Sequence, residues 1–577
     1  MLDRREVARV LREIGTLLQL KGENPFKTRA YETAALRLEE LTEERFADLV
    51  RDGRLEDLPG IGEAISKKVA TLWQTGRLPY HEELRAGFPP GILEMLRVPE
   101  LGPKKVAVLC RELQLGSLDE LAQACRAGRV RELKGFGARS ETKILEGILA
   151  LRPRDQRRPL AMARPVALEL AARLRAVPGV RHAEAAGSVR RFRETVADVD
   201  IVVAAPRCDP TFDALVASPS VAQIIGRGET KCSVVMRDGL QVDVRVVPEE
   251  SWATAMHHFT GSKAHHVRLR GIARDRGLTI SEYGVERLAD HHRLPIASEA
   301  DLYSALGMAP IPPEMREDTG EVEAALEGRL PRVVEAADVL GYLHVHTRDS
   351  DGTATVLQMA QAVRALGGRY LAITDHSRSA GYAGGLDAAR LRAQWDAIDA
   401  AQEQVPEVRL LRGSEVDILE DGRLDYPAEI LDRLDLVVAS IHSRFKLDEE
   451  AMTRRLLAAL DDPHVHVLGH LTGRLIGKRD PYPFQLAPVL EKAARLGVAL
   501  EINGNPERLD LSADHASQAC SCGARLVITS DAHSVAGLSE LEYAVATARR
   551  GWVRREDVLN CLPPDQFLAS LRGARRA

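Results

Sequence analysis

Cysteines, aromatic residues and long apolar runs are all scarce in this sequence of 577 residues. Its seven cysteines are odd in number and scattered, which excludes a disulfide framework and favours a reducing compartment. No apolar run reaches about 18 residues, and the chain begins with an amphipathic helical pattern, so neither a membrane span nor a secretory leader is expected. The proportions of hydrophobic residues (45%) and charged residues (28%) exclude a disordered or collagen-like chain. We therefore expect a folded cytoplasmic protein of several domains.

Charge is divided unevenly along the chain. Residues 321–577 hold 30 Lys and Arg against 38 Asp and Glu, whereas the first 320 residues are slightly basic. This asymmetry indicates a region that handles a polyanion, joined to a region rich in carboxylates.

Three short segments in the first 150 residues resemble one another. Each has a hydrophobic residue, a tight glycine turn and a helical pattern with Lys or Arg in its first turns, as in Leu58-Pro59-Gly60-Ile61-Gly62, Val98-Pro99-Glu100-Leu101-Gly102 and Leu133-Lys134-Gly135-Phe136-Gly137. Such a turn presents N–H groups to a phosphate oxygen, and nearby cations attract DNA of any sequence. The segments resemble helix-hairpin-helix motifs. The DNA-binding residues expected from them are Gly60, Gly62, Lys68, Gly102, Lys104, Lys105, Gly135 and Gly137.

Paired carboxylates mark the region after residue 160, where helical and strand patterns mix. Asp198 and Asp200 are two residues apart in a predicted strand and so point to the same side. Asp243 lies in another predicted strand, residues 240–247. Three converging carboxylates repel one another unless cations bind, and two Mg²⁺ or Mn²⁺ ions about 3.5–4 Å apart suit in-line attack on a phosphate.

A glycine turn lies shortly before these carboxylates. Gly187 and Ser188 are placed to open a helix that binds a triphosphate, and Arg191 would neutralise its charge. An Asp-x-Asp pair alone is common on protein surfaces. The segment His258-Phe259-Thr260-Gly261-Ser262-Lys263, followed by Arg268 and Arg270, adds the specificity that the pair lacks.

On these residues the sequence resembles a family X DNA polymerase over residues 1–315. The resemblance implies that Asp198, Asp200 and Asp243 are catalytic metal ligands. It also implies a template contact by Arg270 and nucleotide contacts by Gly187, Ser188, Arg191, Phe259, Gly261, Ser262 and Lys263. His258 and His266 stand where the family commonly has tyrosine and asparagine, which leaves sugar discrimination and fidelity open.

Lys68 matches the Schiff-base lysine of the family's lyase domains. A Schiff-base amine must be partly deprotonated, which a cationic neighbour such as Lys67 promotes. A solvated lysine that touches a DNA phosphate is the alternative, and the sequence favours it.

Ligand-type side chains recur at the ends of predicted strands after residue 335. Short apolar strands alternate there with helical stretches, which predicts βα units in a parallel barrel or sheet. Because catalytic groups collect at the carboxyl ends of such strands, we expect these side chains to converge. They are His344, His346, Asp351, His376, Glu415, His442, His470, Asp531 and His533. So many imidazoles and carboxylates fit up to three divalent metals, either Zn²⁺, Mn²⁺ or Fe.

These motifs resemble the PHP (polymerase and histidinol phosphatase) superfamily over residues 335–577. The resemblance implies three metal positions, held by His344, His346, Glu415 and Asp531, by Glu415, His442 and His470, and by Asp351, His376 and His533. Asp349 is an alternative to Asp351. The cations of the nearby loops either hold a nucleic-acid backbone or form a solvated face; they are Arg444, Lys446, Arg474, Lys478 and Arg479.

We expect a multidomain α/β protein with a helix-hairpin-helix N-terminal region, a mixed α/β nucleotidyltransferase palm with a thumb, and a distorted (β/α) barrel. The expected domains are residues 1–90 (lyase-like), 91–155 (fingers-like), 156–250 (palm), 251–315 (thumb), 316–334 (linker) and 335–577 (PHP). The resemblance implies a monomeric bacterial polymerase that fills gapped or nicked DNA from dNTPs in repair, with a separate 3′→5′ exonuclease. Two alternatives stay open: a phosphoesterase of small phosphate esters whose front half tethers it to DNA, and a non-enzymatic scaffold for DNA ends.

Overall fold

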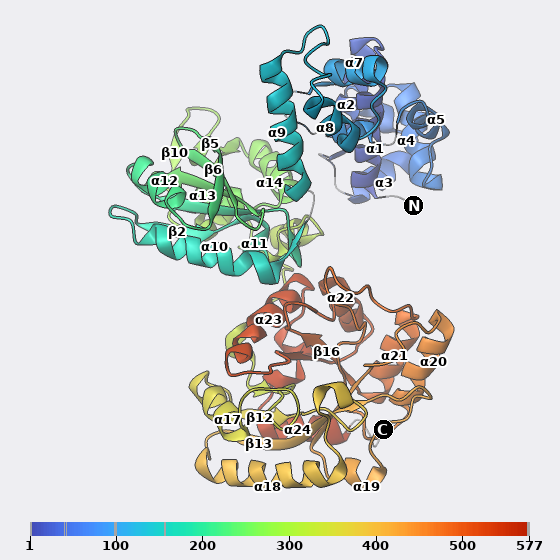
Figure 1. Cartoon of the computed structure of the whole chain (residues 1–577), viewed down its shortest axis with the longest axis vertical. Coiled ribbons are helices and arrows are strands. Elements are labelled where there is room, and N and C mark those ends of the chain that lie inside the picture. The colour runs from blue at the N-terminus through green and yellow to red at the C-terminus, as the bar shows by residue number, and fades with distance from the viewer. Residues whose placement is uncertain are drawn as a thin grey trace. The chain divides into compact units, whose positions relative to one another are not determined.

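The structure, a computed structural model, describes residues 3–39, 41, 43–89, 91–96, 98, 101–154 and 157–573 (Figure 1). The chain forms two compact units. The first comprises Met1–Arg157, Phe212–Val244 and Gly261–Ile296, and the second comprises Arg158–Thr211, Arg245–Thr260 and Ala297–Ala577. None of the described helices is both long and apolar enough to cross a membrane.

Helices build the N-terminal part of the first unit around one hydrophobic core. Asp3 caps the first helix by accepting a hydrogen bond from the N–H of Glu6 at 2.8 Å. The core includes Leu17 and Val69 from the first 90 residues and Val106 and Ile148 from the next 60, so the two predicted helical domains pack as one body. The helices are α1 (Arg4–Leu20), α2 (Pro25–Glu39), α3 (Glu43–Arg51), α4 (Glu63–Thr75), α5 (Pro79–Ala86), α6 (Ile92–Met95), α7 (Pro103–Leu113), α8 (Leu118–Arg126) and α9 (Ala138–Arg154).

The three glycine segments form the same hydrogen-bonded turn. In each, the N–H of the second hydrophobic residue donates to the carbonyl of the first, as in Ile61 to Leu58 (3.1 Å), Leu101 to Val98 (3.1 Å) and Phe136 to Leu133 (3.0 Å). Gly60 and Gly135 have φ angles of +93° and +94°, a conformation that favours glycine. Pro99 and Glu100 of the second segment lie outside the described residues.

A five-stranded sheet has the order β2-β4-β7-β6-β5, and a three-stranded antiparallel sheet has the order β10-β9-β8. The strands are β1 (Arg158–Pro159), β2 (His182–Ala185), β3 (Thr195–Val196), β4 (Asp198–Ala204), β5 (Val221–Arg227), β6 (Lys231–Met236), β7 (Gln241–Val247), β8 (Leu278–Ile280), β9 (Val285–Arg287) and β10 (Arg293–Leu294). The helices of this region are α10 (Leu160–Arg175), α11 (Gly187–Arg190), α12 (Asp209–Val216), α13 (Trp252–Thr260), α14 (Lys263–Asp275), α15 (Glu299–Ala305) and α16 (Glu321–Leu326).

Residues 316–334, expected to be a linker, contain a packed helix instead. Arg316 is 2% exposed and its Nη1 lies 2.6 Å from Oε1 of Glu299. Glu321 is fully buried at the start of α16 and accepts hydrogen bonds from the N–H groups of Asp318 and Thr319. Arg316 thus ties this segment to α15, and Glu321 fixes the turn that precedes α16. The Pro- and Glu-rich stretch of residues 309–331 suggests a domain boundary in the sequence.

Seven parallel strands form the C-terminal barrel, in sequence order from β11 to β17 (Figure 1, yellow to red). The first and last strands meet where the N–H of His346 donates to the carbonyl of Ala532 at 2.8 Å. The strands are β11 (Gly341–Tyr342), β12 (Tyr370–Ile373), β13 (Arg409–Asp417), β14 (Leu436–Ser440), β15 (Val467–Leu468), β16 (Ala499–Asn503) and β17 (Leu526–Thr529). The helices are α17 (Val356–Ala365), α18 (Ala388–Gln404), α19 (Ala428–Leu431), α20 (Glu449–Leu460), α21 (Leu486–Leu496), α22 (Ala513–Ser521), α23 (Leu541–Arg550) and α24 (Pro564–Gly573). The predicted fold class is confirmed.

The inward-facing residues of the barrel change from apolar to polar along each strand. Alternate residues of a strand share a face, so Leu411, Gly413, Glu415 and Asp417 of β13 face the same side. Leu411 packs in an apolar core at the amino ends of the strands, closed by Phe567 of α24. Glu415 and Asp417 follow at the carboxyl end. This pattern gathers the polar residues at the end where barrel sites form.

Candidate functional site

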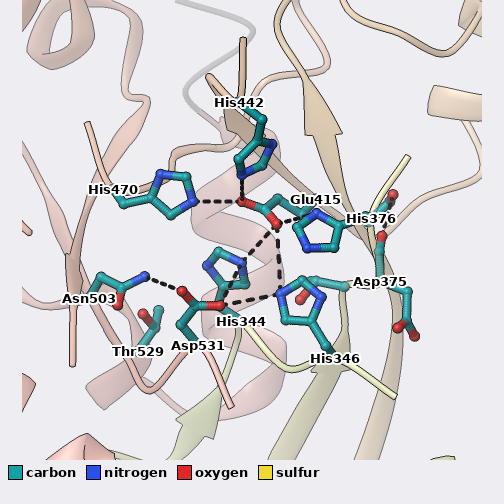
Figure 2. A network of polar contacts seen from close by, with 12 residues as sticks. His344, His346, Asp375, His376, Glu415, His442, His470, Asn503, Thr529 and Asp531 are labelled. Carbon is teal, nitrogen blue, oxygen red and sulfur yellow. Dashed lines mark hydrogen bonds and ion pairs between the residues drawn. The ribbon is translucent and has the colours of Figure 1, made fainter. Parts of the chain in front are cut away.

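Glu415 lies at the centre of the polar cluster, surrounded by imidazoles (Figure 2). Its side chain is 1% exposed. Oε1 is 2.8 Å from Nε2 of His470 and 3.3 Å from Nε2 of His442, and Oε2 is 2.8 Å from Nδ1 of His376. One carboxylate therefore bridges imidazoles from three different strand ends.

Asp531 forms a second focus of the cluster. Its Oδ1 is 3.6 Å from Nε2 of His344 and 3.3 Å from Nε2 of His346. Its Oδ2 is 3.6 Å from Nε of Arg508 and accepts a hydrogen bond from the amide of Asn503 at 3.1 Å. The carboxylate thus links two candidate metal ligands to a cation.

Asp351, and not Asp349, faces the imidazoles. Its oxygens lie 3.4 Å from His533 Nε2, 3.5 Å from His376 Nε2 and 3.8 Å from His346 Nδ1. Asp349 instead accepts a hydrogen bond from the amide of Gln394 at 2.9 Å. Because its carboxylate is bound to Gln394, Asp349 does not join the cluster.

Three overlapping sets of side chains have ligand atoms within 4.8 Å of one another and could each hold a metal ion: His344 with His346 and Asp531, His376 with Glu415 and His442, and His346 with Asp351, His376 and His533. Within the part of the chain that the structure describes, Nε2 of His344 and Nδ1 of His346 are buried and make no hydrogen bond. A buried unpartnered nitrogen is costly, and coordination of a cation would satisfy it. The donor set therefore fits divalent metals.

The charges of the cluster suit metal binding. Burial alone would raise the pKa of Glu415, but the imidazoles of His442, His376 and His344 hold it well below its usual range. Burial, and then the neighbouring His376, lowers the pKa of His346 to about 3. In these forms Glu415 and His346 can bind a metal. Burial would lower the pKa of His344, His376 and His442, but the nearby carboxylates raise it, so these imidazoles would lose a proton on coordination.

Two further carboxylates support the cluster, and sequence reasoning missed both. Glu501 is fully buried on β16, with Oε1 2.6 Å from Nδ1 of His344 and Oε2 accepting the N–H of His470 at 2.6 Å. Asp417 of β13 contacts Nδ1 of His442. A carboxylate on the far nitrogen of a metal-binding imidazole fixes its tautomer and orientation. The available signal was a glutamate at an inward position of an apolar strand, flanked by Leu500 and Ile502.

The palm carboxylates occupy the predicted strands. Asp198 and Asp200 are half-buried on β4 and alternate with buried Val199 and Ile201, so they share a face. Gly187, with φ +57°, opens α11 against Asp200: a Cβ at this glycine would lie 2.2 Å from Asp200 Oδ2. The glycine turn and this carboxylate therefore pack together.

Asp243 lies on β7, in the first unit, whereas the other two palm carboxylates belong to the second. Its Oδ2 is 2.8 Å from Nζ of Lys231 on β6, and its Oδ1 accepts a hydrogen bond from the amide of Gln241 at 2.9 Å. Burial would raise the pKa of Asp243, but its hydrogen bonds to Lys231 and neighbouring side chains lower it. Sequence reasoning had overlooked Lys231.

Arg191, expected to meet a triphosphate, is held by other groups. Its Nε is 3.0 Å from Oε1 of Glu317, and its Nη1 donates to the carbonyl of Thr260. Glu317 also lies 3.4 Å from Nη1 of Arg550 on α23. The carboxylate thus shares its charge between a palm arginine and a barrel arginine.

The predicted thumb residues lie around the junction of α13 and α14. Phe259 is near the end of α13, with its ring centroid 4.9 Å from that of His258. Ser262 caps α14 by accepting the N–H of His265 at 3.2 Å, and Gly261 precedes it. Lys263 begins α14, and Arg270 is exposed further along it, while His266 is 8% exposed.

The lysines after the first glycine turn have local partners. Lys67, expected to act as a cationic neighbour of Lys68, is paired with Glu63 at 2.6 Å, which offsets its charge. Nζ of Lys68 donates to the carbonyl of Ala64 at 3.1 Å and lies 5.0 Å from the ring centre of Tyr80.

The loop cations of the barrel are mostly paired. Arg444 is 3.0 Å from Glu420, and Lys478 is 2.7 Å from Glu507. Arg474 contacts Glu194 at 2.7 Å. Arg479 instead lies over the ring of Phe445, 4.0 Å from its centre.

Comparisons with known proteins match four parts of the chain to family models: a helix-hairpin-helix domain (residues 3–78), a SAM-like helix-hairpin-helix tandem (92–148), a DNA polymerase beta thumb (255–317) and a PHP domain (342–505). The chain is 38% identical over 561 residues to the DNA polymerase/3′-5′ exonuclease PolX of Bacillus subtilis (strain 168), covering 97% of each protein. About 38% of the chain is also similar to probable phosphatases: that of Thermoanaerobacter sp. (strain X514) is 29% identical over 88% of its length, and that of Syntrophotalea carbinolica is 25% identical over 90%. The chain belongs to the family X DNA polymerases that carry a C-terminal PHP domain, and it is a homologue of the polymerase/exonuclease PolX.

Proposed function

We propose that this protein, a monomer in the cytoplasm, fills short gaps in DNA from dNTPs at its palm and removes nucleotides from 3′ ends at its barrel. The observation that carries the proposal is the 38% identity with a DNA polymerase/3′-5′ exonuclease along nearly the whole chain. The carboxylates expected for the first reaction and the nine ligand-type residues expected for the second are all present. The helix-hairpin-helix turns would hold the DNA backbone through their N–H groups.

At the palm, Asp198, Asp200 and Asp243 would hold two Mg²⁺ or Mn²⁺ ions. When bound, these ions would stabilise the charge of the attacking and leaving oxygens. Gly187 fixes the turn against Asp200 and presents Ser188 for the triphosphate. Lys231 balances the charge of Asp243, which a bound metal ion would otherwise balance. Phe259, Gly261, Ser262 and Lys263 would position the incoming nucleotide.

At the barrel, the nine residues would hold up to three ions of Zn²⁺, Mn²⁺ or Fe, because imidazole and carboxylate donors suit these metals. When bound, the ions would polarise a phosphodiester and lower the pKa of the attacking water. Glu501 and Asp417 keep His344 and His442 oriented with their other nitrogens toward the cluster. Glu415 stays ionised among its imidazoles and so would be available as a ligand.

The test uses one gapped, 5′-labelled DNA with and without dNTPs, in Mn²⁺ or Mg²⁺. Asp198→Ala with Asp200→Ala should abolish primer extension and leave 3′ degradation intact, and His344→Ala with His346→Ala should do the reverse. Asp213→Ala and His464→Ala, whose side chains lie outside both sites, are the matched controls. Extension by the first double variant would refute the palm assignment. Degradation by the second would refute the barrel assignment.

A second candidate function is hydrolysis of small phosphate esters at the barrel, which the similarity to probable phosphatases favours. Wild-type protein that cleaves p-nitrophenyl phosphate far faster than a DNA 3′ end would support it. Wild-type protein that neither extends nor degrades DNA would indicate a scaffold for DNA ends.

A further inference from the structure

An exposed aromatic ring lies beside the barrel cluster. Tyr382 is 72% exposed and belongs to a short 3₁₀ helix, η5 (Gly381–Ala383), in the loop after β12. Its ring centroid is 6.2 Å from that of His376 and 6.2 Å from that of His442. A large ring is thus offered to solvent at the carboxyl end of the strands, next to two candidate metal ligands.

The loop that carries this tyrosine is tied down on both sides. The N–H of Ser379 donates to Asp425 at 2.6 Å, and its hydroxyl donates to the other oxygen of that carboxylate. At the far side, the hydroxyl of Tyr426 donates to the carbonyl of Leu386 at 2.6 Å. Gly385 packs so closely that a Cβ there would lie 2.0 Å from the carbonyl oxygen of Ser377. A loop whose backbone is already held in place loses little backbone entropy when a ligand covers its exposed ring.

Two arginines lie in the loops after β15 and β16, at the same end of the barrel as Tyr382. Arg508 lies 3.6 Å from Asp531, and Arg479 lies over Phe445. Burial first, and then the charge of Arg508, lowers the pKa of Arg479, so the two guanidinium groups repel each other. Burial and the carboxylates of Glu415 and Asp417 raise the pKa of the Tyr382 hydroxyl, while Arg508 acts in the opposite direction, and Tyr382 in turn acts electrostatically on Arg479. Neighbouring like charges of this kind favour an anionic ligand between them.

We propose that Tyr382 stacks on the terminal nucleobase of a DNA 3′ end while Arg508 and Arg479 hold its phosphates. An aromatic face accepts any base, so such a subsite binds single strands without sequence preference. The inference rests on the proposed exonuclease function and names its substrate class: a 3′ end that carries a base, in preference to a small phosphate ester.

The test measures degradation of a 5′-labelled single-stranded oligonucleotide by the full-length protein in Mn²⁺. Tyr382→Ala should raise KM roughly ten-fold at nearly unchanged kcat, as expected for loss of one base–aromatic stack. Tyr382→Phe should behave as wild type, and Tyr382→Leu, which keeps apolar bulk without a ring, should behave as the alanine variant. On an oligonucleotide with an abasic 3′ terminus, wild type and Tyr382→Ala should have equal KM values.

The outcomes test the exonuclease function and the stacking subsite separately. A wild-type protein that does not degrade the oligonucleotide overturns the exonuclease function itself. Normal degradation with equal KM values for wild type and Tyr382→Ala overturns the stacking subsite alone. An equal rise in KM for Tyr382→Ala on normal and abasic 3′ ends also overturns the stacking subsite, because the effect would then not involve a base. Primer extension at the wild-type rate verifies that each variant is folded.

Discussion

Replacing Glu501 by glutamine should weaken metal binding at the barrel without touching the palm. Oε1 of this buried carboxylate lies 2.6 Å from Nδ1 of His344 and accepts the hydroxyl of Thr529 at 2.7 Å. Oε2 accepts the N–H of His470 and the amide of Asn503. Either orientation of a glutamine would turn its NH₂ group toward two of these donors. His344 would then lose the anion that fixes its ring.

Loss of such a supporting carboxylate typically weakens metal affinity about 10–100-fold, or about 1.4–2.8 kcal/mol. The assay is the Mn²⁺ concentration that gives half-maximal 3′ degradation, which should rise by that factor for Glu501→Gln. Primer extension by the same protein is the internal control. Glu507→Gln, which alters an exposed partner of Lys478, is the matched variant and should leave the Mn²⁺ dependence unchanged. An unaltered Mn²⁺ dependence for Glu501→Gln would refute the supporting role.

Two other predictions concern the palm side of the second unit. Burial would raise the pKa of Glu299, but Arg316 and Arg190 lower it from 4.5 to about 2. Its ionised form therefore stabilises the protein above pH 4.5, and this contribution is lost as pH falls toward 2. Glu299→Gln should lower the free energy of unfolding, measured with urea, by about 3 kcal/mol at pH 7. A decrease of the same size at pH 3 would contradict the reasoning. Gly187→Ala should reduce primer extension at least about ten-fold, because its Cβ would displace the Asp200 carboxylate. Gly179 also has a positive φ but does not contact Asp200, so Gly179→Ala should extend primers at the wild-type rate. An equal loss of primer extension in both variants would indicate backbone strain as the cause.

The sequence reveals features that repeat or alternate. The glycine turns could be predicted because one pattern of hydrophobic residues and glycines occurs three times, and the structure gives each the same hydrogen bond. The barrel could be predicted from its alternation of apolar strands and helices, and the convergence of His344, Glu415 and Asp531 from their places at strand ends.

Partners far apart in the chain left no such signal. Glu317 lies 126 residues from Arg191, and nothing local indicates that the two would pair. Lys231 was missed beside Asp243 because the facing strand carries it. Lys67 was expected to influence Lys68, yet Glu63, one helical turn earlier, neutralises it. Glu501 was missed because a single glutamate in an apolar strand matches no motif.

The contacts within the second unit argue against treating the barrel as a tethered module. Paired charges join the barrel to residues 164–317 of the same unit, in Arg164–Glu542 (2.6 Å), Arg474–Glu194 (2.7 Å), Arg549–Glu314 (3.0 Å) and Arg550–Glu317 (3.4 Å). Arg474 also donates to the carbonyl of Arg508, whose side chain reaches Asp531 in the barrel cluster. Arg474, which pairs with Glu194 of the palm, thus also holds the loop that carries Arg508. Removing the barrel would take Arg474 from Glu194 and Arg550 from Glu317, so the charge balance of these half-buried acids depends on the barrel.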